Sequence, residues 1–148
     1  RVRIPDGMAC DPSSEARRYS TALRQAGGIG LQLLGLGSNG HVGFNEPPSG
    51  FDSPCRVVTL QAATRIQNAE AFGGDSEAVP KQAITLGLQE ILSAKVIHLI
   101  VTGSAKAEIL RTALLEPSTG QVPASWLQQH PQVHLWVDDA AHSRLSAP

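Results

Sequence analysis

The sequence predicts an α/β fold in which helices flank a mostly parallel sheet. Short apolar runs alternate with helix-like segments along the 148 residues, and glycines or prolines separate most of them. Strands that alternate with helices pair in parallel through right-handed crossovers. No repeat, low-complexity tract or linker divides the chain, so we expect a single domain over residues 1–148.

Helices are expected where capping residues precede amphipathic segments. The first runs from Pro12 to about Ala26, because Asp11 is a good N-cap, Pro12 suits the first helical position and Gly27-Gly28 ends it. The other helical segments, in chain order, are 62–72, 88–92, a helix that opens at Gly103-Ser104 and ends near 115, and the short turn 125–129.

Strands are expected where short apolar or β-branched runs are bounded by turn residues. These runs are 29–34, 56–60, 95–101 and 133–137, and 83–86 is either a short strand or a turn. The runs 29–34 and 95–101 have the composition of buried strands. In sheets of this kind ligands bind in loops that follow the carboxyl ends of strands. Three such exits stand out: 35–48, 102–106 and Asp138-Asp139.

Composition argues against several classes of function. Twelve basic and 13 acidic residues give a net charge of −1 with no basic run, which argues against a nucleic-acid partner. No apolar run approaches the ~20 residues of a membrane span, so we expect a soluble chain with no membrane partner. Cys10 and Cys55 form no CxxC motif or disulfide framework, which predicts a reducing, cytoplasmic location. The chain begins with Arg1 and its only methionine is Met8, so we expect it to be a piece of a longer protein, with N-terminal strands missing.

The first exit contains residues suited to acid–base chemistry. His41 can exchange a proton near neutral pH, and Glu46 could orient the imidazole and raise its pKa. Asn39 and Asn45 can hydrogen-bond either the loop itself or a sugar hydroxyl. From these residues alone, a glycine-rich turn with His41 and Glu46 facing solvent is an equally good interpretation.

The loop sequence 37–47, Gly-Ser-Asn-Gly-His-Val-Gly-Phe-Asn-Glu-Pro, resembles the signature of the glucosamine-6-phosphate deaminase family, also called glucosamine-6-phosphate isomerase. The resemblance spans about 29–139, continuing through Ser53, 56–60, Thr64-Arg65, Asn68, Val79-Pro80, 83–87, 102–104, Lys106, Leu127-Gln128 and His130-Pro131. It implies a Rossmann-like three-layer fold. It also implies a cofactor-free conversion, in amino-sugar catabolism, of glucosamine 6-phosphate and water to fructose 6-phosphate and ammonia.

By this resemblance, His41 is the ring-opening acid and base, and Glu46 is its supporting carboxylate. Asn39 stands where several members carry the aspartate of that relay. Lys106 matches the family's phosphate-binding lysine, and the backbone of Gly103-Ser104 at a helix start suits an anion. Gly35 matches a glycine whose backbone approaches the substrate.

The chain also departs from the family pattern. Glu70 stands where many members carry an arginine that contacts the phosphate. The family's phosphate loop and the Asp-Glu-Tyr segment that supplies the C2 base have no counterpart in 1–28, so we expect the base upstream and this piece alone to be inactive. Arg56 matches a position that binds an allosteric amino-sugar phosphate, but Val58 replaces the lysine of regulated members.

The other titratable residues have structural interpretations. We expect Asp138 to cap a helix with Asp139 solvated, His98 to be a satisfied core histidine, and Glu90, Glu108 and Glu116 to be surface charges. His130 and His134 lack the spacing of metal ligands, so no metal is predicted.

Two alternatives to a deaminase stay open. One is a 6-phosphogluconolactonase-like hydrolase, which shares the fold but lacks the continuation Phe-Asn-Glu-Pro found at 44–47. The other is a non-catalytic sugar-phosphate-binding module. Each takes a small sugar phosphate as its partner, and a homo-oligomer is also left open.

Overall fold

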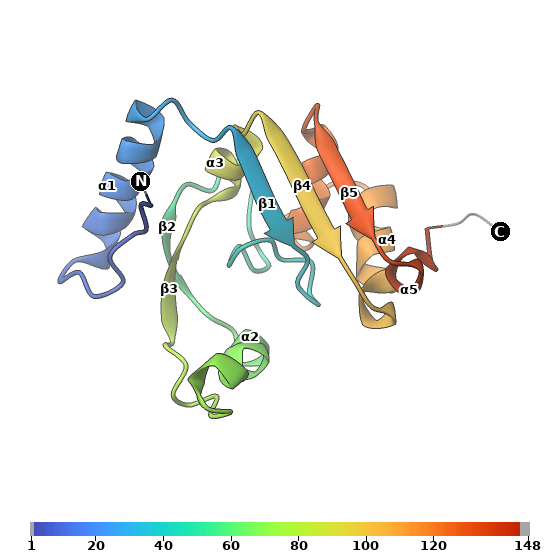
Figure 1. Ribbon diagram of the computed structural model, residues 1–148, viewed down its shortest axis with the longest axis horizontal. Helices are drawn as coiled ribbons and strands as arrows, with labels where there is room; N and C mark the ends of the chain where they lie inside the picture. The colour runs from blue at the N-terminus through green and yellow to red at the C-terminus, as the bar shows by residue number, and fades with distance from the viewer. Residues whose placement is uncertain (1, 146–148) are drawn as a thin grey trace.

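A computed structural model describes residues 2–145 (Figure 1). Three strands, β1 (Leu31–Gly35), β4 (Val96–Val101) and β5 (Val133–Val137), form a parallel sheet in the order β1-β4-β5. The α/β class with its mostly parallel sheet and flanking helices is therefore confirmed. In the described part of the chain, no helix has the length and apolar character needed to cross a membrane.

The helices follow the capping residues that predict them. Helix α1 (Pro12–Gln25) begins at Asp11, whose Oδ1 accepts a hydrogen bond from the Ser14 backbone at 3.0 Å. The remaining helices are α2 (Ala62–Asn68), α3 (Leu88–Leu92), α4 (Ala107–Leu115) and α5 (Asp139–His142), with the 3-10 turns η1 (Ala69–Phe72), η2 (Ser104–Lys106) and η3 (Pro123–Gln129). The expected continuous helices 62–72 and 104–115 are each divided between an α-helix and a 3-10 turn.

The hydrophobic core lies on one face of the sheet. Side chains that alternate along each strand point to opposite faces, and Leu34, Ile97 and Leu99 point to the face that α3 and α4 cover. Leu88 of α3 and Leu110 of α4 are fully buried against them. This packing fixes the carboxyl end of β1, from which the loop containing His41 leaves.

The opposite face of the sheet corrects two expectations. Leu33, Ile100 and Trp136 are 59%, 44% and 55% exposed, because no described segment covers them. The strands expected at 29–34 and 95–101 are therefore buried on one face rather than on both. His98 lies on this open face and is only half-buried, so it is not a core histidine, although its Nδ1 does accept a hydrogen bond from Trp136 Nε1 at 2.9 Å.

The strands β2 (Arg56–Thr59) and β3 (Gln82–Thr85) do not join the parallel sheet. They pair with each other in antiparallel register, Arg56 with Thr85 and Thr59 with Gln82, and form a separate ribbon with α2 at its far end (Figure 1). The general expectation of parallel pairing therefore holds for β1, β4 and β5 but not for β2 and β3. The ribbon brings α2 to the loop after β1.

Glu90 is buried and does not contribute a surface charge. It is 5% exposed, and its carboxylate accepts hydrogen bonds from Ser20 Oγ at 2.7 Å and from the Gly87 backbone at 3.1 Å. These contacts attach α1 to the start of α3, a long-range role that sequence spacing does not reveal. Glu108 is exposed, and Glu116 forms an ion pair with Arg111 at 3.0 Å, as expected of surface charges.

Candidate active site

The loop after β1 is held in place by its own backbone and by one buried amide. Gly37 donates to the His41 carbonyl at 2.9 Å, which closes the turn around Gly40. Asn45 is fully buried, and its Nδ2 donates to the carbonyls of Val42 at 3.1 Å and Leu86 at 2.8 Å. Of the two roles open to Asn45, the structure supports holding the loop rather than binding a sugar.

The position of the His41 ring depends on a glycine. A Cβ at Gly37 would overlap with Cε1, Nδ1 and Nε2 of the imidazole, so the ring rests directly on the Gly37 backbone. By contrast, a Cβ at Gly35 would meet no protein atom within 4 Å. The two glycines therefore have different roles, one making room for the ring and the other leaving the cavity open.

The polar partner of His41 is Asn39. His41 Nδ1 lies 2.6 Å from Asn39 Oδ1, and the His41 backbone N–H lies 3.3 Å from the same oxygen. Burial lowers the pKa of His41 below 6.5; the charge of Glu46 opposes that shift and the charge of Lys106 adds to it. The expectation that Glu46 acts to raise this pKa is correct in direction, but the net shift is downward because desolvation dominates.

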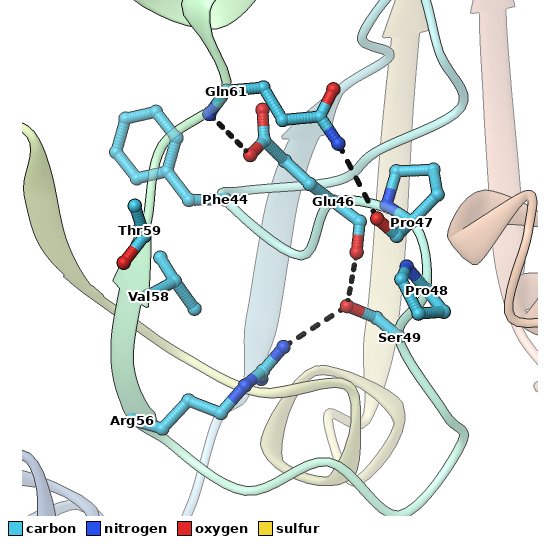
Figure 2. A pocket seen from close by; sticks show the side chains of 9 residues that line it. All are labelled: Phe44, Glu46, Pro47, Pro48, Ser49, Arg56, Val58, Thr59 and Gln61. Atoms are coloured by element: carbon cyan, nitrogen blue, oxygen red, sulfur yellow. Dashed lines mark hydrogen bonds between the residues drawn. The ribbon is translucent and has the colours of Figure 1, made fainter.

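Glu46 contacts α2 rather than the imidazole. Its carboxylate accepts a hydrogen bond from Thr64 Oγ1. It also accepts one from the Gln61 backbone N–H at 2.9 Å, drawn as a dashed line in Figure 2. Glu46 is 8% exposed, so these two donors stabilise a buried carboxylate. Its influence on His41 is therefore electrostatic, without a direct hydrogen bond.

His41 and Lys106 face the same open cavity of ≈ 320 Å³. Gly35 and Gly37 form part of its wall, and Gln67 of α2 closes another side. Burial lowers the pKa of Lys106 from 10.5, so the ammonium is partly desolvated where it meets the cavity. No carboxylate lines the cavity among residues 2–145.

Glu70 lies outside this cavity. It is exposed and lines a separate hollow on α2 and η1 together with Gln67, Asn68 and Ala71. The carboxylate therefore does not lie between His41 and Lys106, and a phosphate held by Lys106 does not have to approach Glu70 directly.

The turn before Lys106 differs from the sequence interpretation. Gly103 N–H points to both carboxylate oxygens of Asp138, at 3.1 and 3.0 Å, so it is not free to bind an anion. Asp138 also caps α5 by accepting from Ala141 N at 2.8 Å, as expected. Asp138 thus joins the exits of β4 and β5 and holds the turn that positions Lys106.

Arg56 lines a different pocket of ≈ 220 Å³, with Glu46 and Ser49 in its wall (Figure 2). Its guanidinium donates to Asn45 Oδ1 at 2.8 Å, to Ser49 Oγ at 3.0 Å and to the Pro54 carbonyl at 3.2 Å. The guanidinium of Arg56 therefore makes three hydrogen bonds to other parts of this chain. An allosteric role for Arg56 stays a prediction.

Sequence reasoning did not identify four residues at this site. Gly37 leaves space for the His41 ring. Gln61 and Thr64 donate hydrogen bonds to Glu46, and Gln67 forms a wall of the cavity. Only the ribbon of β2 and β3 brings Gln61, Thr64 and Gln67 to the loop. Thr64 lies within the stretch that resembles the family, but that resemblance assigned it no role. For Gly37, its position four residues before His41 in a tight turn was the available signal.

Comparison with known proteins places the chain in a family. The family model described as glucosamine-6-phosphate isomerases/6-phosphogluconolactonase matches residues 1–136. The chain is 46% identical over 141 residues to the glucosamine-6-phosphate deaminase of Streptomyces coelicolor, covering 95% of this chain and 54% of that protein. It is 47% identical over 145 residues to the deaminase of Rhodopirellula baltica, covering 98% and 57% respectively.

Solved structures agree with this placement. A monomeric glucosamine-6-phosphate deaminase matches with a TM-score of 0.92 at 44% identity, covering 96% of this chain and 58% of that one. A 6-phosphogluconolactonase from Leishmania guyanensis shares the fold, with a TM-score of 0.68 at 23% identity. The match covers 90% of this chain and 53% of that one. The chain spans little more than half the length of these relatives. It belongs to the family of glucosamine-6-phosphate isomerases and 6-phosphogluconolactonases.

Proposed function

We propose that the protein is a cytoplasmic glucosamine-6-phosphate deaminase of amino-sugar catabolism. It converts glucosamine 6-phosphate and water to fructose 6-phosphate and ammonia. The observation that carries the proposal is the cavity in which a histidine with a fixed ring faces a partly desolvated lysine. The 44% identity and TM-score of 0.92 with a deaminase support this substrate over the lactone of the more distant relatives. Two free cysteines support a reducing compartment.

The cavity can open a pyranose ring. Because His41 Nδ1 faces the Asn39 oxygen, Nε2 is the nitrogen available to the substrate. Nε2 accepts the proton of the C1 hydroxyl and returns a proton to the ring oxygen, which yields the open-chain aldehyde. The negative charge of Glu46 stabilises the transient imidazolium.

Lys106 binds the phosphate end of the same substrate. An ammonium in a partly desolvated wall makes a strong charge-assisted hydrogen bond to a phosphate oxygen. The transfer of the C2 proton needs a further base, and no described residue lining the cavity is a carboxylate. We propose that this base is contributed from outside residues 2–145. The 148-residue chain alone should therefore not convert glucosamine 6-phosphate to products.

The test is a direct substrate comparison on the full-length protein. Purified protein is incubated with glucosamine 6-phosphate or with 6-phosphogluconolactone, and ammonia, fructose 6-phosphate and lactone hydrolysis are followed. We expect ammonia and fructose 6-phosphate in equal amounts, at the ~1–10³ turnovers per second typical of enzymes. Lactone hydrolysis without ammonia would assign the protein to the lactonase branch. Binding of glucosamine 6-phosphate without any turnover would make it a sugar-phosphate-binding module.

A further inference from the structure

We propose that Gln61 is a positioning residue that fixes the direction of the Asn39 amide and, through it, the tautomer of His41. The proposal deepens the proposed function, since it rests on His41 acting through Nε2. It concerns two side-chain amides, each of which can present either an oxygen or an NH₂ group to its neighbour.

The direction of the first amide is set by a backbone carbonyl. Gln61 Nε2 lies 3.4 Å from the carbonyl oxygen of Pro47, which can only accept (Figure 2). The NH₂ group of Gln61 must therefore face Pro47, and Oε1 is left to face Asn39. Asn39 Nδ2 donates to this oxygen at 3.3 Å.

The direction of the second amide is set from the opposite end. The backbone N–H of His41 can only donate, and its partner at 3.3 Å is Asn39 Oδ1. Both ends of the chain of contacts therefore require the same arrangement, with the Asn39 oxygen toward His41 and its NH₂ group toward Gln61. Since Oδ1 also lies 2.6 Å from His41 Nδ1, the ring must carry its proton on Nδ1 and its lone pair on Nε2.

At 3.3 Å, the contact with the His41 backbone N–H is long and does not hold the Asn39 amide by itself. Because residue 39 is an amide, the arrangement also depends on Gln61. A carboxylate presents an acceptor oxygen in either orientation, whereas a reversed amide would direct an NH₂ group at two donors of His41. The oxygen of Gln61 opposes that reversal, because it offers the Asn39 NH₂ group an acceptor. Gln61 itself is held at the N-cap of α2, where its backbone N–H donates to Glu46 Oε2 at 2.9 Å.

The chain contains a histidine with the opposite tautomer, which serves as an internal reference. His130 Nε2 lies 2.8 Å from the Ala94 carbonyl, and its Nδ1 accepts from the Gln132 backbone at 3.1 Å. His130 therefore carries its proton on Nε2. The two rings should give distinct patterns in one spectrum.

The experiment is two-dimensional ¹H–¹⁵N NMR of the histidine rings in full-length protein labelled with ¹⁵N-histidine, recorded at a pH where His41 is neutral. We expect His41 as the Nδ1–H tautomer and His130 as the Nε2–H tautomer. Gln61→Met removes the acceptor while keeping the backbone contact to Glu46, and we expect a mixture of both tautomers at His41. Gln67→Met in α2 removes an amide that donates to Ser38 Oγ at 2.8 Å and should leave the His41 tautomer unchanged. Because Gln67 lines the cavity, this control is read by NMR and not by kinetics.

A second set of variants, made in Asn39→Asp protein, distinguishes a role of Gln61 in orienting the Asn39 amide from general disruption of the site. In Asn39→Asp protein, Gln61→Met should leave the Nδ1–H tautomer intact, because a carboxylate accepts in either orientation. In the Asn39 background, kcat should fall in proportion to the Nδ1–H population that is lost, with KM unchanged. A wild-type His41 that is Nε2–H, or a Gln61→Met protein that keeps a fully populated Nδ1–H tautomer, would overturn the proposal. The NMR result is independent of turnover, so it stands apart from a failure of the proposed deaminase activity.

Discussion

The imidazole of His41 lies against the backbone of Gly37, in space that any Cβ at residue 37 would occupy. Gly37→Ala should therefore displace the ring from Asn39, and overpacking of this kind typically costs about 1–3 kcal/mol of stability. We expect a large loss of kcat.

Gly35→Ala is the matched control, because a Cβ at Gly35 meets no protein atom within 4 Å. This variant should keep the wild-type melting temperature and raise KM, since the new methyl group enters the substrate cavity. Steady-state kinetics and thermal unfolding of both variants check the pair. Equal kinetics for the two alanine variants would contradict the distinct roles given to the glycines.

The pKa of His41 should respond in opposite directions to its two charged neighbours. The wild-type pKa lies below 6.5, since burial disfavours the imidazolium. Lys106→Met removes a repelling positive charge and should raise the pKa, whereas Glu46→Gln removes an attracting negative charge and should lower it further. NMR titration of the ring measures all three values. Shifts of the same sign in both variants would be inconsistent with this electrostatic arrangement.

The same pKa difference makes stability depend on pH. The unfolded chain binds the His41 proton at higher pH than the folded protein does, so protonation favours unfolding. The free energy of unfolding should therefore decline as the pH falls below 6.5 toward the folded pKa. Denaturant unfolding at several pH values should show that His41→Gln removes this part of the decline.

Lys106 should discriminate between phosphorylated and unphosphorylated sugars. We expect Lys106→Ala to weaken binding of glucosamine 6-phosphate by about 1.5–3 kcal/mol, the size of a hydrogen bond to a charged group. Binding of unphosphorylated glucosamine should be unchanged. Calorimetric titration with both sugars makes the comparison, and equal losses for the two would mean that the lysine supports the fold rather than the phosphate.

The two cysteines should differ in reactivity. Cys10 is exposed, whereas Cys55 is buried and burial raises its pKa to about 11. At pH 8 we expect a thiol reagent to label Cys10 rapidly and Cys55 only after denaturation, because the thiolate is the reactive form. Peptide mass spectrometry after brief labelling locates the modified residue. Fast labelling of Cys55 in folded protein would contradict the burial of its thiol.

Local patterns predict this fold well and its long-range contacts poorly. Asp11 and Asp138 cap helices as their neighbours indicate, since capping depends on the next three residues. Whether β2 and β3 join the parallel sheet depends on partners far along the chain, and their antiparallel ribbon was not predicted. The burial of Glu90 is missed for the same reason, because its partner Ser20 is 70 residues away.

The candidate site follows the same rule. The loop sequence identifies His41, and the strand exit identifies Lys106. Both titratable residues that line the cavity could therefore be predicted. Thr64 and Gln61 could not, because they reach Glu46 only through the fold of the ribbon. The Gly103 backbone was assigned to an anion from its helix start, but the structure gives its N–H to Asp138.

The central claim is that His41 opens the sugar ring, and His41→Gln in the full-length protein tests it most directly. Glutamine keeps polar groups near Asn39 but cannot exchange a proton near neutral pH. We expect kcat for ammonia release from glucosamine 6-phosphate to fall by ~10²–10⁴-fold, as for the loss of a general acid–base group, with the fold retained by circular dichroism. Ammonia release at a near wild-type rate would remove His41 from the mechanism and contradict the proposed function of the site.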